Sequence, residues 1–174
     1  MSIEGKPRTV KPGRESSIAS EVRRRVPSHR VSACERDLQD LVFMIPQLLD
    51  RLDQMWQQPG VPSSIKRLAG YVRSYVCHPY DVIPEADGRL FGYADDAYLA
   101  AEVYLRAADS LPYGHPLKRG QEWQFLVRTR ALRSTARFVI AAEAERIDAI
   151  ITGLLAGDDR LYQRVFSNPV PPPQ

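Results

Sequence analysis

The spacing of apolar residues is the feature of this sequence that most limits its fold. Large apolar side chains recur at steps of three and four residues in several long segments, which places them on one stripe of an α-helix. The strict alternation of apolar and polar residues that marks a half-buried strand does not occur. The sequence therefore predicts an all-α fold of four to five helices, packed as a small irregular bundle.

Prolines divide the first half of this pattern into two helices. Apolar residues at helical spacing predict a first helix over about 33–57, with a kink at Pro46, because proline lacks the N–H that a helix interior requires. The segment Pro59–Pro62 should end it. A second helix is then expected to run from about residue 63 to residue 78, where Pro79 follows.

Acidic residues and a glycine mark the ends of two later helices. Asp95 and Asp96 are expected to open a third helix, in which Glu102 and Arg106 pair one turn apart. The longest helical pattern spans about 120–156, a length that favours a bend, and Gly157 follows at the usual C-terminal position. Its inward stripe includes Leu132, Ala136 and Val139. The aromatic residues at helical spacing, among them Trp56, Trp123, Phe125 and Phe138, are predicted to be core.

The composition predicts a single domain with two extensions. A chain of 174 residues, 44% hydrophobic and 26% charged, can bury one core without a metal or disulfide. Residues 1–30 are basic and poor in large apolar residues, which predicts a disordered arm. Residues 31–166 are expected to form one helical domain, and residues 167–174 an extended proline-rich tail.

The sequence also limits where the protein acts. No run of about 18 apolar residues occurs, so no integral membrane segment is expected. The N-terminal stretch has no apolar core of the kind found in secretory signals. Cys34 and Cys77 have no second ligand at metal-binding spacing, which favours reduced thiols. We therefore expect a cytoplasmic protein, with attachment to a membrane surface left open.

The richest local pattern lies between the second and third predicted helices. It reads Pro79-x-Asp81-x-Ile83-Pro84, followed by Gly92-Tyr93-x-Asp95-Asp96. This pattern resembles the signature of the YkvA-like family of small helical domains, and the resemblance covers about residues 63–105. It implies a helical domain without an established biochemical activity, found alone or attached to other modules and in some members beside or within membranes. The polar residues Cys77, His78 and Asp87–Arg89 depart from the usual pattern and argue against a membrane-embedded form.

The acids of this motif have two interpretations. Asp81, Asp95 and Asp96 can cap a turn and the start of the third helix by accepting hydrogen bonds from free backbone N–H groups. Alternatively, the same three acids, with Glu85 or His78 nearby, offer hard oxygen ligands for Mg²⁺, Mn²⁺ or Ca²⁺. Capping alone explains an acid at each position, so no cofactor is expected.

Basic residues form a second candidate site for binding. Three arginines share one face of the long helix, two basic residues precede it, and a run of arginines lies in the N-terminal arm. Such a surface suits nucleic acid, anionic lipid or an acidic protein. The candidate anion-binding residues are Lys118, Arg119, Arg130, Arg133, Arg137, Arg23, Arg24 and Arg25.

These patterns lead to three functional hypotheses. The sequence contains neither a Gly-x-Ser-x-Gly elbow nor a phosphate-binding glycine loop, so catalysis has no clear signature. The first hypothesis is a non-enzymatic accessory protein that presents the Pro/Asp-rich loop and its basic surfaces to a protein partner. The second is a binder of nucleic acid or anionic membrane through the arm and the arginine face. The third is a metal-dependent enzyme at Asp81, Asp95 and Asp96.

Overall fold

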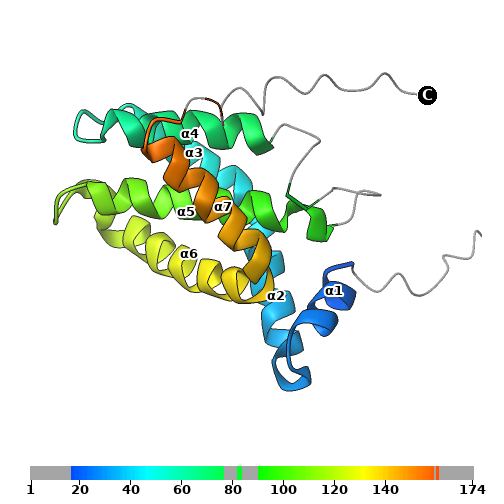
Figure 1. Cartoon of the computed structure of the whole chain (residues 1–174). Coiled ribbons are helices and arrows are strands. Elements are labelled where there is room, and N and C mark those ends of the chain that lie inside the picture. The colour runs from blue at the N-terminus through cyan, green and yellow to red at the C-terminus, as the bar shows by residue number, and fades with distance from the viewer. Residues whose placement is uncertain (1–16, 77–81, 84–89, 159, 161–174) are drawn as a thin grey trace, which may run out of the picture.

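The computed structural model describes residues 17–76, 82–83, 90–158 and 160. Seven α-helices and no strand occur in these residues (Figure 1). The all-α prediction is confirmed, whereas the predicted four to five helices is an undercount. The helices are α1 (Ser17–Arg25), α2 (Val31–Phe43), α3 (Ile45–Trp56), α4 (Ser63–Val76), α5 (Ala94–Ser110), α6 (Gly120–Val139) and α7 (Ala141–Leu155).

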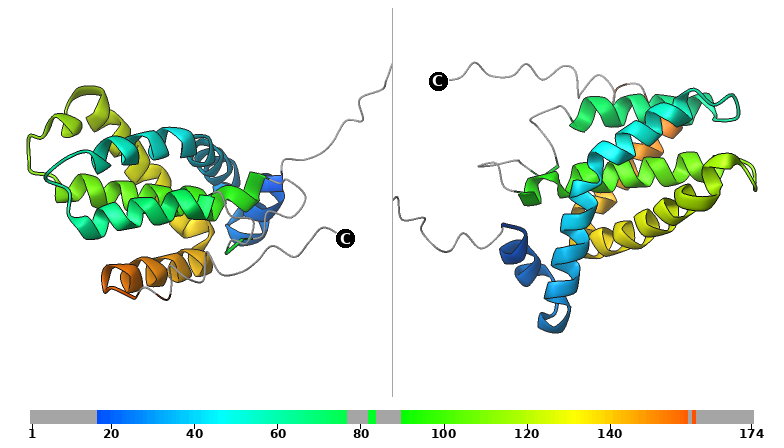
Figure 2. Two further views of the ribbon diagram at one scale, coloured as in Figure 1. Left: turned by 90° about the horizontal axis from the view of Figure 1, so that it is seen from above. Right: turned by 180° about the vertical axis from the view of Figure 1, so that it is seen from behind.

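Helix α5 lies at the centre of the bundle. Figures 1 and 2 show α3, α4, α6 and α7 packed around it from different sides, and all four contact it. Of its 17 residues, 14 are buried. A helix that is covered on every side needs small side chains where neighbours approach closely. The six alanines of α5 meet that need, because all of them are buried at 1% exposure or less and leave room for the surrounding helices.

The helix predicted over 33–57 is two helices. Helix α2 ends at Phe43 and α3 begins at Ile45, with Pro46 in the first turn of α3. Proline fits that position because the first-turn N–H groups of a helix have no intrahelical acceptor. Met44 closes α2 by donating its N–H to carbonyl groups of the preceding turn. The expected kink is thus a complete break, which adds one helix to the count.

The long helical pattern over 120–156 also breaks. Ile140 leaves helical geometry with φ −109° and ψ 45°, and its side chain is fully buried. The chain therefore turns between α6 and α7, and α7 packs back on α4 and α5. The positive φ of Gly157, +87°, confirms the predicted C-terminal glycine, because this backbone conformation is costly for residues with a Cβ.

The prediction of a disordered arm over residues 1–30 is wrong from residue 17 onward. Helix α1 packs on α2 and on the short 3₁₀-helix η3 (Leu90–Tyr93), and Ile18 and Val22 are fully buried. These two side chains, four residues apart, supply the apolar stripe that holds α1 in place. Residues 1–16, like the proline-rich tail 167–174, lie outside the described residues. Among the described helices, none is long and apolar enough to cross a membrane.

Candidate functional site

The carboxylate of Asp95 joins the two halves of the motif. The hydroxyl of Tyr75 and the backbone N–H of Ile83 both donate to Asp95 Oδ2, each at 2.9 Å. The N–H of Val82 in turn donates to the Tyr75 hydroxyl oxygen at 2.8 Å. Asp95 has no exposed surface, and Ile83 is also buried. One acid therefore ties α4, the described part of the loop and the start of α5 together.

The electrostatics of Asp95 fit a structural role. Burial raises the pKa of its carboxyl group above the usual range, while the hydrogen bonds from Ile83 and Tyr75 lower it. The backbone amides of Asp95 and Asp96, at the start of α5, lower the pKa further. The amides at the start of α5 thus favour the ionised carboxylate electrostatically, whereas its hydrogen bonds to other described residues run to α4 and to the loop.

The other motif residues do not assemble into an open site in the described structure. Gly92 and Asp96 are buried, and Tyr93 is partly buried and precedes α5 as its N-cap residue. Pro79, Asp81 and Pro84 lie outside the described residues. Within the described ranges, no group of three or more His, Cys, Asp or Glu side chains is placed to hold a metal ion.

Two of the predicted anion-binding arginines are paired with carboxylates of α5. Arg130 contacts Asp109 at 2.9 Å, and Arg133 Nε donates to Glu102 Oε2 at 2.6 Å. Glu102 is 5% exposed and also accepts from Arg106 at 2.9 Å, which confirms the predicted pair one turn apart. The positive charge of this part of α6 is therefore largely neutralised within the bundle.

Arg137 is paired as well, with residues of two other helices. Its guanidinium forms an ion pair with Asp148 of α7 and donates to the Tyr98 hydroxyl of α5 at 2.7 Å. The Tyr98 hydroxyl donates to Asp148 at 3.0 Å. Burial raises the pKa of Tyr98 to about 12, and the negative charge of Asp148 adds to the effect. These contacts join α5, α6 and α7 and leave Arg137 little capacity for an outside anion.

The arginines of the arm lie on α1. Arg24 pairs with Glu21 at 3.0 Å, and Arg25 pairs with Glu143 of α7 at 2.8 Å. Arg23 lies in the same last turn of the helix. Tertiary packing has thus supplied carboxylates for two of these side chains, and the run does not form the mobile basic arm that the sequence suggests.

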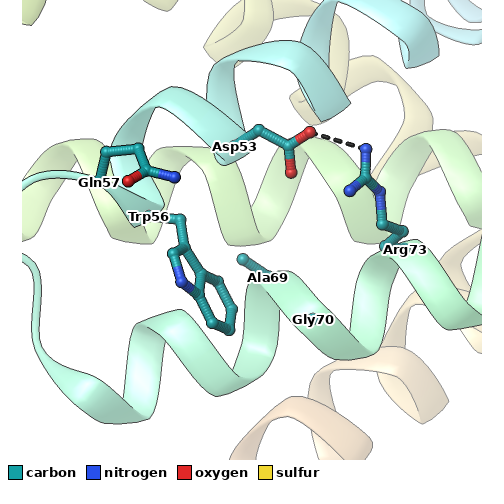
Figure 3. Close-up of a pocket in the computed structure, with 6 residues that line it drawn as sticks. All are labelled: Asp53, Trp56, Gln57, Ala69, Gly70 and Arg73. Carbon is teal, nitrogen blue, oxygen red and sulfur yellow. Dashed lines mark hydrogen bonds and ion pairs between the residues drawn. The ribbon is translucent and has the colours of Figure 1, made fainter.

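A pocket of about 420 Å³ lies between α3 and α4 (Figure 3). Figure 3 shows the Trp56 indole beside Ala69 and Gly70, with Asp53 and Arg73 pointing toward one another. The ion pair between these two side chains spans 2.7 Å, and the indole lies 3.6 Å from where a Cβ on Gly70 would stand. Because Asp53 and Arg73 neutralise each other and the Trp56 indole packs on Gly70, the residues that line this pocket mainly hold α3 and α4 together.

A second pocket, of about 440 Å³, lies where the α5–α6 connection enters α6. We call it the α5–α6 pocket; it is lined by Tyr113, Gly114, Lys118, Arg119, Gly120 and Trp123. Gly114 and Gly120 have φ of +85° and +55°, so the connection turns sharply at both ends of this short stretch. Tyr113 is 104% exposed and Trp123 is 49% exposed. Two aromatic rings therefore border the pocket in contact with solvent.

The cations of the α5–α6 pocket differ from those further along α6. Lys118 Nζ donates to the backbone carbonyl of Leu111, an uncharged acceptor. In the part of the chain that the structure describes, neither Lys118 nor Arg119 forms an ion pair with a carboxylate. Of the predicted basic residues on and before α6, these two keep their charge available to a ligand.

The sequence interpretation missed the aromatic part of this site. It treated Trp56, Trp123 and Phe138 as core, yet Trp56 of α3 is 44% exposed, and Trp123 and Phe138 of α6 are 49% and 43% exposed. The signal was present in the spacing, because both positions lie on the side of α6 opposite the inward residues Leu132 and Ala136.

Comparisons of the chain with protein-family models, with curated proteins and with solved structures found no match.

Proposed function

We propose that this protein is a non-enzymatic helical interaction protein that binds an anionic segment of a partner protein at the α5–α6 pocket. One observation carries the proposal: Lys118 and Arg119 lie beside two exposed aromatic rings, and neither pairs with a carboxylate of the described residues. The arginines further along α6, by contrast, are paired with acids of this chain. A cytoplasmic location, consistent with the free buried thiol of Cys34, is part of the same proposal.

The chemistry of the pocket suits an acidic segment that also carries apolar side chains. Unpaired cations at the rim attract carboxylates and orient the approaching chain. Tyrosine and tryptophan supply large apolar areas with few rotatable bonds, which is why they dominate binding energy at interfaces. Tyr113 and Trp123 are both exposed in the free protein and so have apolar surface to bury on binding.

Nucleic acid and anionic lipid are the competing ligands. Aromatic rings next to cations also bind single-stranded nucleic acid, but such sites track the backbone over several nucleotides along a basic groove. Here Arg130, Arg133 and Arg137 are ion-paired, so the available positive charge on this face is confined to the pocket. A local charge favours a short acidic peptide over a long polyanion.

The motif contributes to the fold that positions this pocket. We propose that residues 63–105 form a YkvA-like domain, supported by the contact of Ile83 and Tyr75 with Asp95. The Pro/Asp-rich loop is the other candidate surface for binding a protein partner. Of its described residues, Ile83 is buried and Val82 is partly buried, so the proposal rests on the pocket rather than on the loop.

A tryptophan titration tests the proposal directly. Trp56 and Trp123 are the two tryptophans, so Trp56→Phe leaves Trp123 as the reporter in the pocket. We would titrate this variant with a synthetic peptide of glutamate, leucine and phenylalanine. Binding should change the Trp123 emission, and Arg119→Glu should weaken it by roughly tenfold or more, because it places two like charges together. Arg146→Glu, at an exposed position of α7, makes the same charge change elsewhere and should have little effect.

Three parallel titrations decide between the ligands. A peptide with lysine in place of glutamate should not bind. A single-stranded oligonucleotide and phosphatidylserine vesicles should bind more weakly than the acidic peptide at physiological salt. Preferential binding of the oligonucleotide or the vesicles would replace the protein partner with that ligand, and equal binding by wild type and Arg119→Glu would exclude the pocket.

A further inference from the structure

The outer face of α6 carries an apolar stripe. Trp123, Val127 and Phe138 are 49%, 49% and 43% exposed, and Ala131 and Ser134 on the same face are also exposed. At 3.6 residues per turn, these five side chains fall within an arc of about 80°. Figure 1 shows α6 on the outside of the bundle, with its other side toward α5. We call this set the outer stripe of α6.

The outer stripe is too regular to be scattered surface apolarity. Its members follow steps of four, four, three and four residues, the spacing of a seam between packed helices. The buried residues of α6 are Leu126, Thr129, Leu132, Ala136 and Val139. These buried residues lie on the opposite side of α6. The helix therefore has two apolar faces, and the other helices of the bundle cover only the inner one in the described structure. At one end of the outer stripe the Arg30 guanidinium lies 4.4 Å from the Phe138 ring centre, and at the other end Trp123 borders the α5–α6 pocket.

The sizes of the side chains are symmetric along the outer stripe. The large rings of Trp123 and Phe138 stand at its two ends, about 22 Å apart along the helix, and the small residues Ala131 and Ser134 lie between them. If a second α6 lies antiparallel with the two-fold axis near Ala131, Phe138 of one subunit comes opposite Trp123 of the partner subunit. The small residues then meet at the centre, where helices approach most closely.

The charges beside the outer stripe also suit an identical partner. Arg130 pairs with Asp109, Arg137 with Asp148, and on the other flank Arg128 pairs with Asp40 at 2.9 Å. Two copies of an arginine-rich face would repel each other if these cations were free. Because each is neutralised within its own chain, the flanks of two copies can approach, whereas a strongly charged partner would gain little here.

We infer that the outer stripe of α6 is the interface of a two-fold symmetric homodimer, in which two α6 helices pack antiparallel across Ala131. The contact is isologous, since each subunit offers the same surface. The inference goes beyond the proposed function and does not depend on it. Trp123 lines the α5–α6 pocket as well as the outer stripe, so a dimer and a bound peptide would compete for its ring. Arg119, the cation of the pocket tested above, is not part of the stripe.

Analytical ultracentrifugation of the full chain over a range of concentrations tests the dimer. The wild-type chain should dimerise reversibly. Ala131→Glu brings two like charges together at the axis and should raise the dissociation constant roughly 100-fold or more. Glutamate is well tolerated on an exposed helix surface, so the thermal melt should stay nearly unchanged. Ala142→Glu, the same change at an exposed position of α7, should leave the dimer intact.

A charge swap checks the antiparallel register. Ala131→Lys alone should also prevent dimerisation, and a mixture of the Ala131→Glu and Ala131→Lys chains should form a heterodimer. A wild-type chain that stays monomeric at every concentration overturns the inference, as does a dimer that Ala131→Glu leaves unchanged. Failure of the mixture to associate excludes a two-fold axis near Ala131. Arg119→Glu should leave association unchanged, which separates this test from that of the α5–α6 pocket.

Discussion

Helices α5 and α6 have similar lengths and neighbouring positions, yet they use their apolar residues in opposite ways. Helix α5 is buried over 14 of its 17 residues, whereas 5 of the 20 residues of α6 are buried. Helix α5 is surrounded by other helices, while α6 packs on one side (Figure 1). Its side chains Trp123, Val127 and Phe138 are left half exposed. The difference indicates that apolar residues stabilise the fold in α5 and remain available for binding in part of α6.

Truncating an apolar side chain in each helix is the strongest test of this difference. Leu99 of α5 is 1% exposed, so Leu99→Ala should lower the free energy of unfolding by about 3 kcal/mol, through lost burial and a residual cavity. Val127→Ala on α6 should change it by less than about 0.5 kcal/mol. Urea unfolding measures the change in free energy for both variants. Val127→Ala is made in the Ala131→Glu chain so that association does not contribute. Equal losses would show that the outer stripe is part of the core.

The ion pairs of the two helices give a smaller contrast. Glu102 of α5 is 5% exposed and accepts from Arg106 and Arg133, so Glu102→Gln should cost about 1–2 kcal/mol, because two cations lose their shared partner. Arg130→Gln breaks a pair whose side chains are 54% and 64% exposed and should cost less than about 0.5 kcal/mol. Urea unfolding of both variants at low and high salt measures the two losses of stability. A larger loss for Arg130→Gln than for Glu102→Gln would contradict the view that the ion pairs of Glu102 contribute more to the fold.

The smallest expected effect is a change in pH dependence at Asp95. Its folded-state pKa is raised by burial, so the unfolded chain ionises first as pH rises. The wild-type chain should therefore lose stability relative to Asp95→Asn as pH increases from the ordinary aspartate range through the raised pKa. Urea unfolding of both chains across this range gives the difference. A difference that grows in the opposite direction would mean that the hydrogen bonds from Tyr75 and Ile83 outweigh the burial.

Local signals predicted much of the helical framework. Apolar spacing located six of the seven described helices within four predicted segments, two of which divide into two helices each, and it separated helix from strand throughout the described chain. Pro59 and Pro62 correctly marked the break before α4, whereas Pro46, predicted to kink a single helix, lies in the first turn of α3 because proline is tolerated at a helix start and not in its interior. The pair of Glu102 and Arg106 was predictable for the same reason, since residues four apart on a helix always face one another.

The candidate site was less predictable, because it depends on contacts between distant segments. The basic residues before and along α6 look alike in sequence, but Arg130, Arg133 and Arg137 pair with acids in α5 and α7. Lys118 and Arg119 pair with no carboxylate in the described ranges. The sequence around Arg130 does not indicate that Asp109, 21 positions away, is its ion-pair partner. An unpaired cation can therefore be recognised only after the helices are packed.

The sequence by itself determined the helical class of this protein, the outer ends of its longer helical segments and the spacing of apolar residues within them. These properties follow from backbone geometry and from side chains within one or two turns of each other. Tertiary structure decided that α1 folds on the bundle, that chain breaks fall at Met44 and Ile140, and which apolar faces become core. It also decided which charges remain free. Burial and ion pairing are properties of packed helices, so the difference between α5 and α6 exists only in the folded bundle.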